Sequence, residues 1–158
     1  MKAIITGELI GQYQRMWRSL REAIANTPQG EWQTGSDDYA LPARLAYHVL
    51  HAADLYLTTM GYEEYKPHRG YKLDWERTSP ADLPAREAMM ACVNMTEGKV
   101  KGWLGQLGDE GLLKEQSDYH WTGKTALGRA IYVLQHCQVH IGEINAELRR
   151  HGIEGGRW

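Results

Sequence analysis

Four long segments of this chain repeat apolar residues at intervals of three and four, the period of an α-helix. They cover about residues 6–26, 41–60, 80–107 (the start lies near Pro80 or Pro84) and 125–150. In the first segment the shared apolar face consists of Leu9, Tyr13, Met16, Leu20 and Ile24. No segment alternates with a period of two for long enough to predict a strand. The sequence therefore predicts an all-α protein.

The connections between these segments are rich in Gly, Pro and Asp, and the one at 61–79 is long for a compact domain. Its aromatic residues argue against disorder, and they are Tyr62, Tyr65, Tyr71 and Trp75. A chain of 158 residues can bury one real core but is short for two domains. We therefore expect residues 1–158 to form a single domain, an antiparallel four-helix bundle with a long connection between helices 2 and 3.

Charge and composition exclude several classes of function. The formal net charge is −2, so the chain lacks the basic footprint of a nucleic-acid-binding protein. No polybasic tract or apolar run of roughly 20 residues predicts contact with a membrane, and the N-terminal stretch lacks the apolar core of a signal peptide. Two cysteines, Cys92 and Cys137, do not make a disulfide framework. We expect a cytoplasmic protein with reduced thiols.

The aromatic composition sets a condition on the core. The chain contains six Trp and nine Tyr but no Phe. Aromatic core positions must then be filled by side chains that carry an N–H or O–H group, and each buried group needs a hydrogen-bond partner.

Three histidines form the most specific chemical pattern. His136 and His140 lie four residues apart, so on a helix they project from one face. His48 falls within the inward stripe of the second helix, which is formed by Leu41, Leu45, Ala52 and Leu55. A buried imidazole needs a partner or a metal, because an unpaired buried polar group costs about 1–3 kcal/mol. Three neutral imidazoles can hold one divalent ion and leave positions open for water or substrate. His51 lies off the stripe, and we predict that it is not a ligand.

Two interpretations fit the pair on the fourth helix. His136 and His140 lie beside the apolar arc of that helix rather than at its centre. This placement suits a metal site in a groove at the mouth of the bundle, covered by loops. It also suits two ordinary surface histidines.

Neighbouring residues extend the candidate site. Glu143 is one turn beyond His140, where it could hydrogen-bond a metal-bound water or orient a ligand, or else be a solvated surface residue. Cys137 points about 100° away from the histidine face and fits a core residue. His120, in the loop before the fourth helix, could approach the site but is also typical of an exposed loop. The chain contains no HExxH, CxxC, GxSxG or phosphate-binding loop, and no pair of ExxH motifs for a di-iron site.

These residues give the chain a resemblance to a known family. His48 in AYHVLHAAD, and His136 and His140 in LQHCQVHIGEINAELRRHG, resemble the pattern of the DinB superfamily, the DinB/YfiT-like metalloenzymes, over essentially the whole chain. The resemblance implies a four-helix bundle, frequent homodimers, and a nickel, zinc or iron ion on the three histidines. The family often has Arg-Gly-Gln where this chain has Ile141-Gly142-Glu143. The absent Arg puts anionic-substrate recognition from that position in doubt, and the Glu adds a possible base.

Three functions are consistent with this sequence. The resemblance implies a metal-dependent enzyme that activates a thiol or water, a thiol-dependent transferase or a hydrolase, whose small-molecule substrate is used with a low-molecular-weight thiol. The alternative is a non-catalytic metal- or ligand-binding stress-response protein. The third is an interaction domain with incidental histidines. Metal content separates the third function from the others, and turnover separates the first from the second.

Overall fold

The computed structural model describes residues 3–65 and 74–156. Its helices are α1 (Ile4–Asn26), α2 (Pro42–Tyr56), α3 (Arg86–Leu112) and α4 (Ala126–Arg150). Short 3-10 turns, η1 (Gln29–Glu31), η2 (Tyr62–Glu64), η3 (Pro80–Asp82) and η4 (His120–Thr122), lie in the connections. The described residues contain no strand, only an isolated bridge between Glu115 and Thr125. The all-α prediction is confirmed. Tyr71 of the long connection lies outside the described residues.

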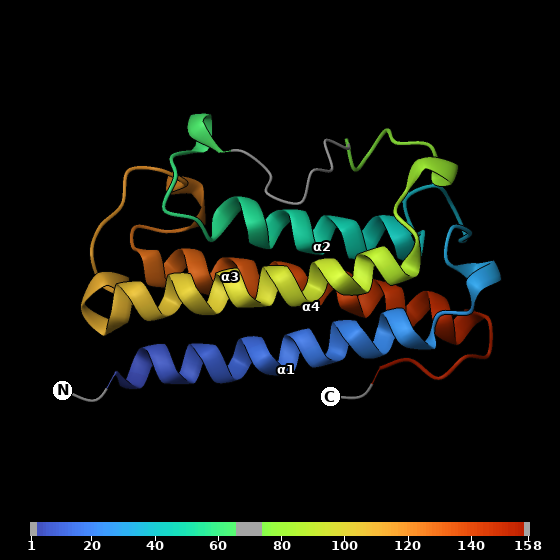
Figure 1. Ribbon diagram of the computed structural model, residues 1–158, viewed down its shortest axis with the longest axis horizontal. Coiled ribbons are helices and arrows are strands. Elements are labelled where there is room, and N and C mark those ends of the chain that lie inside the picture. The colour runs from blue at the N-terminus through green and yellow to red at the C-terminus, as the bar shows by residue number, and fades with distance from the viewer. Residues whose placement is uncertain (1–2, 66–73, 157–158) are drawn as a thin grey trace.

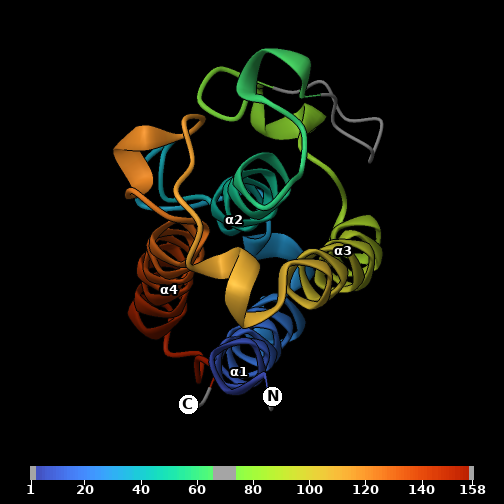
Figure 2. The same ribbon diagram turned by 90° about the vertical axis from the view of Figure 1, so that its left-hand side faces the viewer.

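The four helices pack side by side around a common core (Figures 1 and 2). Seen end-on, α1 lies opposite α2 and α3 lies opposite α4, so α2 has α3 and α4 as its neighbours. Figure 1 shows that α2 and α3 run in the same direction, against α1 and α4. A short loop after α2 would make α3 antiparallel to it. The long connection instead joins the end of α2 to the opposite end of the bundle, where α3 begins. A four-helix bundle with this connection is present, but the expectation that it is antiparallel holds only in part. The neighbours α1–α3 and α2–α4 are antiparallel, whereas the neighbours α2–α3 and α1–α4 are parallel.

No helix in the described ranges is long and apolar enough to cross a lipid bilayer.

That residues 1–158 form one domain stays a prediction.

Two helix bounds differ from the periodic pattern, each for a local reason. α2 ends at Tyr56 because Leu57 leaves the helical region, with φ −96° and ψ 61°. α3 continues to Leu112 through a kink at Gly108, whose φ of 59° is accessible to glycine without a Cβ clash. After the kink, the carboxylate of Asp109 accepts hydrogen bonds from the backbone N–H groups of Ile5 (3.2 Å) and Thr6 (2.8 Å). It therefore caps the N-terminus of α1, whose first N–H groups have no partner within the helix.

The aromatic core residues find the partners that their polar atoms require. The Tyr13 hydroxyl donates to the carbonyl of Ala130 on α4 at 2.7 Å, and the Trp32 indole N–H donates to the carbonyl of Pro84 at 2.9 Å. Both side chains are fully buried. These bonds tie α1 to α4 and the loop after α1 to the start of α3. For Tyr13 and Trp32 the expected partners are present.

Replacing Tyr13 by Phe removes one buried hydrogen bond and leaves the ring in place. We expect Tyr13→Phe to lower the free energy of unfolding by about 0.5–1.5 kcal/mol. Urea denaturation followed by circular dichroism measures the change. Tyr62→Phe is the control, because the Tyr62 side chain is exposed. An equal loss in both variants would contradict the assigned role of the Tyr13 bond.

Candidate metal centre

The packing of α2 against α4 brings His48, His136 and His140 together. One nitrogen from each ring lies within 4.8 Å of the other two. The Nε2 atoms of His48 and His136 are 2.9 Å apart. The ring centroids form a nearly equilateral triangle, with sides of 4.8, 4.6 and 4.6 Å. The prediction that these three histidines form one cluster is confirmed.

The spacing of the nitrogens fits a shared ion. Two nitrogens bound to one metal at about 2.0–2.1 Å lie about 3.0–3.4 Å from each other. The His48–His136 separation of 2.9 Å lies close to the lower end of this range, and the third imidazole lies within 4.8 Å. Small side-chain rotations would therefore place all three nitrogens around one ion.

The environment keeps two of the imidazoles neutral. Burial, together with the nearby rings of His140 and His136, lowers the pKa of His48 to about 3. Burial and the His140 ring lower the pKa of His136 to about 4. At neutral pH both rings are therefore neutral imidazoles, which is the protonation state that a metal requires.

Glu143 lies next to the cluster and contacts one of its members. Its Oε2 atom is 2.7 Å from Nδ1 of His140. In this contact Nδ1 of His140 is the donor and the carboxylate is the acceptor, so Nε2 is the nitrogen that remains for a metal. A carboxylate in this position fixes the tautomer and orientation of a metal-binding histidine. His140 is 8% exposed, and the Glu143 side chain is 40% exposed, so the carboxylate lies between the cluster and solvent.

His48 is held by packing instead of by a carboxylate. Its Nδ1 atom is buried and has no hydrogen-bond partner in the described part of the chain. The indole ring of Trp75 stacks on the imidazole, with 3.8 Å between centroids and 28° between planes. An apolar cover of this kind restricts the ring without satisfying its second nitrogen, and metal-bound histidines usually have a partner there.

A buried arginine on α2 fixes the segments that cover the cluster. Arg44 is 3% exposed and donates to the backbone carbonyls of Asp38 (2.6 Å), Trp75 and Thr78 (2.8 Å). One guanidinium group thus holds the loop between α1 and α2 and the end of the long connection. Neither Arg44 nor Trp75 was expected at the site, and the only sequence signal was the aromatic content of that connection.

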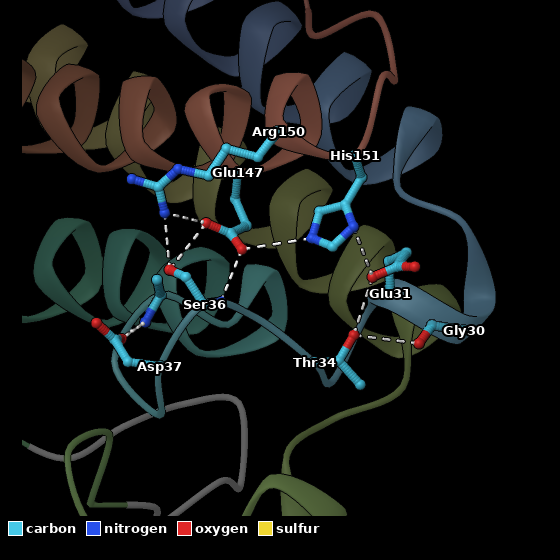
Figure 3. A network of polar contacts seen from close by, with 9 residues as sticks. Gly30, Glu31, Thr34, Ser36, Asp37, Glu147, Arg150 and His151 are labelled. Atoms are coloured by element: carbon cyan, nitrogen blue, oxygen red, sulfur yellow. Dashed lines mark hydrogen bonds and ion pairs between the residues drawn. The ribbon is translucent and has the colours of Figure 1, made fainter.

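A second polar network fastens the loop after α1 to α4 (Figure 3). The buried carboxylate of Glu147 accepts from the backbone N–H of Ser36 at 2.7 Å and from its hydroxyl at 3.1 Å, and it pairs with Arg150 at 2.9 Å. This attachment places Tyr39 beside the site, where its ring meets Trp75 edge-on at 5.9 Å. Burial and the nearby Glu143 carboxylate raise the pKa of Tyr39.

Other candidate residues lie elsewhere. His51 stacks on Tyr47 at 6.0 Å and does not belong to the three-histidine cluster, and that it binds no metal stays a prediction. His120 is exposed in η4, against Trp121. Cys137 is fully buried, its Sγ lies 3.8 Å from the carbonyl of Val49, and burial raises its thiol pKa to about 12. It is a core residue of the α2–α4 contact.

The lowered pKa values predict acid sensitivity of the metal-free protein. In the unfolded chain His48 and His136 take up protons near pH 6.5, but in the folded chain only near pH 3 to 4. Within this window the unfolded state binds more protons, so stability is full above about pH 6.5 and falls on acidification towards pH 4. Urea midpoints of metal-free protein between pH 7.5 and 4.5 measure the loss. A His48→Asn, His136→Asn variant should show a shallower pH slope, and equal slopes would contradict this account.

Comparison with known proteins adds no family assignment: no family model matches the chain, and neither does any curated protein or solved structure. The likeness to the DinB superfamily rests on the histidine pattern and stays a prediction.

Proposed function

We propose that this chain is a metal-dependent enzyme of the DinB/YfiT-like type, with one divalent ion (nickel, zinc or iron) on His48, His136 and His140. The observation that carries the proposal is the convergence of three imidazole nitrogens within 4.8 Å, from two helices far apart in the sequence. When bound, an ion on three neutral ligands would act as a Lewis acid and lower the pKa of a thiol or water.

The surrounding residues would position the ligands and limit water. Glu143 orients His140 through the 2.7 Å contact, and its partial exposure lets it pass a proton to solvent. Trp75 shields one face of His48, and Arg44 fixes the backbone on either side of that shield. The reaction class we infer is thiol-dependent transfer or hydrolysis.

The resemblance also suggests the partners. We propose a small-molecule substrate used together with a low-molecular-weight thiol, and a homodimer as the assembly. Analytical ultracentrifugation of the metal-loaded protein tests the second proposal.

The cover over His48 favours one alternative. A ring stacked at 3.8 Å under Trp75 suits a protein that retains its ion, so the second candidate is a non-catalytic metal- or ligand-binding stress-response protein. Screening turnover of electrophiles with and without added thiols distinguishes it from the enzyme.

Metal content tests the ligand set directly. Untagged protein should carry about one divalent ion per chain by plasma mass spectrometry. His48→Ala should reduce this content sharply, while His51→Ala, a matched change one turn along α2, should leave it intact. Metal-free protein that also fails to bind nickel and zinc at micromolar concentration would refute the site. Equal losses in the two variants would show that the wrong histidine of α2 was assigned.

Glu143→Gln separates orientation from ligation. We expect metal affinity and turnover to fall by about 10- to 100-fold without emptying the site, the usual effect of removing a partner of a ligating histidine. His140→Ala should abolish both. Metal titration and activity are measured on the same samples, with Glu87→Gln as a control on an exposed carboxylate of α3. Complete loss of metal in Glu143→Gln would make that residue a ligand, and full activity in metal-free His140→Ala would refute the mechanism.

A further inference from the structure

Arg129 is a buried cation without a bonded acid. It is 8% exposed near the start of α4, and its guanidinium lies over the rings of Trp103 (5.1 Å) and Tyr119 (5.0 Å). Within the described ranges it makes no hydrogen bond or ion pair, and its Nε atom is buried without an acceptor. Asp118 acts on it electrostatically but is not bonded to it. An unpaired buried charge is costly, and a helix N-terminus favours an anion over a cation.

Gln116, which lies near Arg129, carries an acceptor atom that also lacks a partner. The amide nitrogen of Gln116 donates to the carbonyl of Gly123 at 3.3 Å, which fixes the orientation of the amide. Its Oε1 atom is buried and accepts from no donor in the described residues. Gln116 and Arg129 together line two grooves, of about 360 and 390 Å³, where α3 ends and α4 begins. A donor and an acceptor thus both lack partners at one place.

The remaining lining defines the charge and polarity of the smaller groove. It carries two carboxylates, Glu115 and Asp118, opposite in sign to the single guanidinium, and an apolar wall formed by Trp103 and Leu107. A simple anion would pair with the arginine alone and a simple cation with the carboxylates alone, so each would leave the groups of the other sign unpaired. A molecule that carries both charges satisfies each group, and the groove volume lies in the range of small-molecule sites.

We propose that this groove binds an α-amino acid with an apolar side chain. The ligand carboxylate accepts from the Arg129 guanidinium, whose planar fork matches it. The ligand ammonium faces the carboxylates of Glu115 and Asp118 and, once the Gln116 amide turns towards the groove, donates to its Oε1. The apolar side chain lies against Trp103. None of the three clustered histidines lines this groove, so the site is independent of the metal centre.

Three matched probes test the charge requirement. Leucine, its deaminated analogue isocaproate and its decarboxylated analogue isoamylamine are titrated into the full-length, metal-free protein by calorimetry. We expect saturable binding of leucine, and binding of each analogue at least about tenfold weaker. Equal binding of isocaproate would overturn the proposal in favour of a plain anion site. Failure of leucine and methionine to bind at millimolar concentration would also overturn it.

A pair of arginine variants tests why Arg129 is there. Arg129→Met removes the unpaired charge but keeps an apolar side chain, so leucine binding should be lost while the melting temperature of the free protein is unchanged or higher. Arg44→Met is the matched control, because Arg44 is equally buried but bonded to three carbonyls, and it should lower the melting temperature. Destabilisation by Arg129→Met with intact leucine binding would assign Arg129 a purely structural role and refute the proposal.

Discussion

The contact between α2 and α4 is the interaction on which the candidate metal centre depends. His48 and His136 are 88 positions apart, and only this packing places their nitrogens 2.9 Å from each other. The contact is close because small side chains such as Cys137 and Val49 fill it. Burial in this contact, and then the nearness of the other imidazoles, lowers the pKa of His48 and His136, so the same packing that assembles the cluster also keeps these two rings neutral.

The helices and the shared face of His136 and His140 could be predicted from sequence because both follow from a local period. That His48 joins this pair depends on the packing of α2 against α4, and the family resemblance supported that expectation. A residue within an apolar stripe of one helix faces the core wherever the rest of the chain goes, which placed His48 inward. The relation of Glu143 to His140 is also local, since residues three apart meet on one helix face. The periodic pattern did not predict the end of α3, because the helix continues past a kink at Gly108. The turn after the kink is stabilised by the contact of Asp109 with the distant N-terminus of α1.

The cover of the cluster could not be predicted, because it depends on contacts between loops. Trp75 was one of several aromatic residues in the long connection, and no pattern distinguished it from the others. Its position over His48 follows from the path of the backbone, which Arg44 determines by binding carbonyl groups. Every residue offers the same backbone carbonyl, whatever its side chain. The sequence therefore does not show which carbonyl groups an arginine will bind. The buried position of Arg129 could not be predicted either, because it depends on the rings of Trp103 and Tyr119 from other segments.

Attachment through carbonyls has a consequence for how such a protein can diversify. Arg44 contacts only the main chain of Asp38, Trp75 and Thr78, so their side chains are not required for the anchor. Substitutions at these positions would change the chemistry above the histidines and leave the course of the loops intact. One arginine on a rigid helix therefore lets the side chains of these loops change during evolution while the path of the loops stays the same.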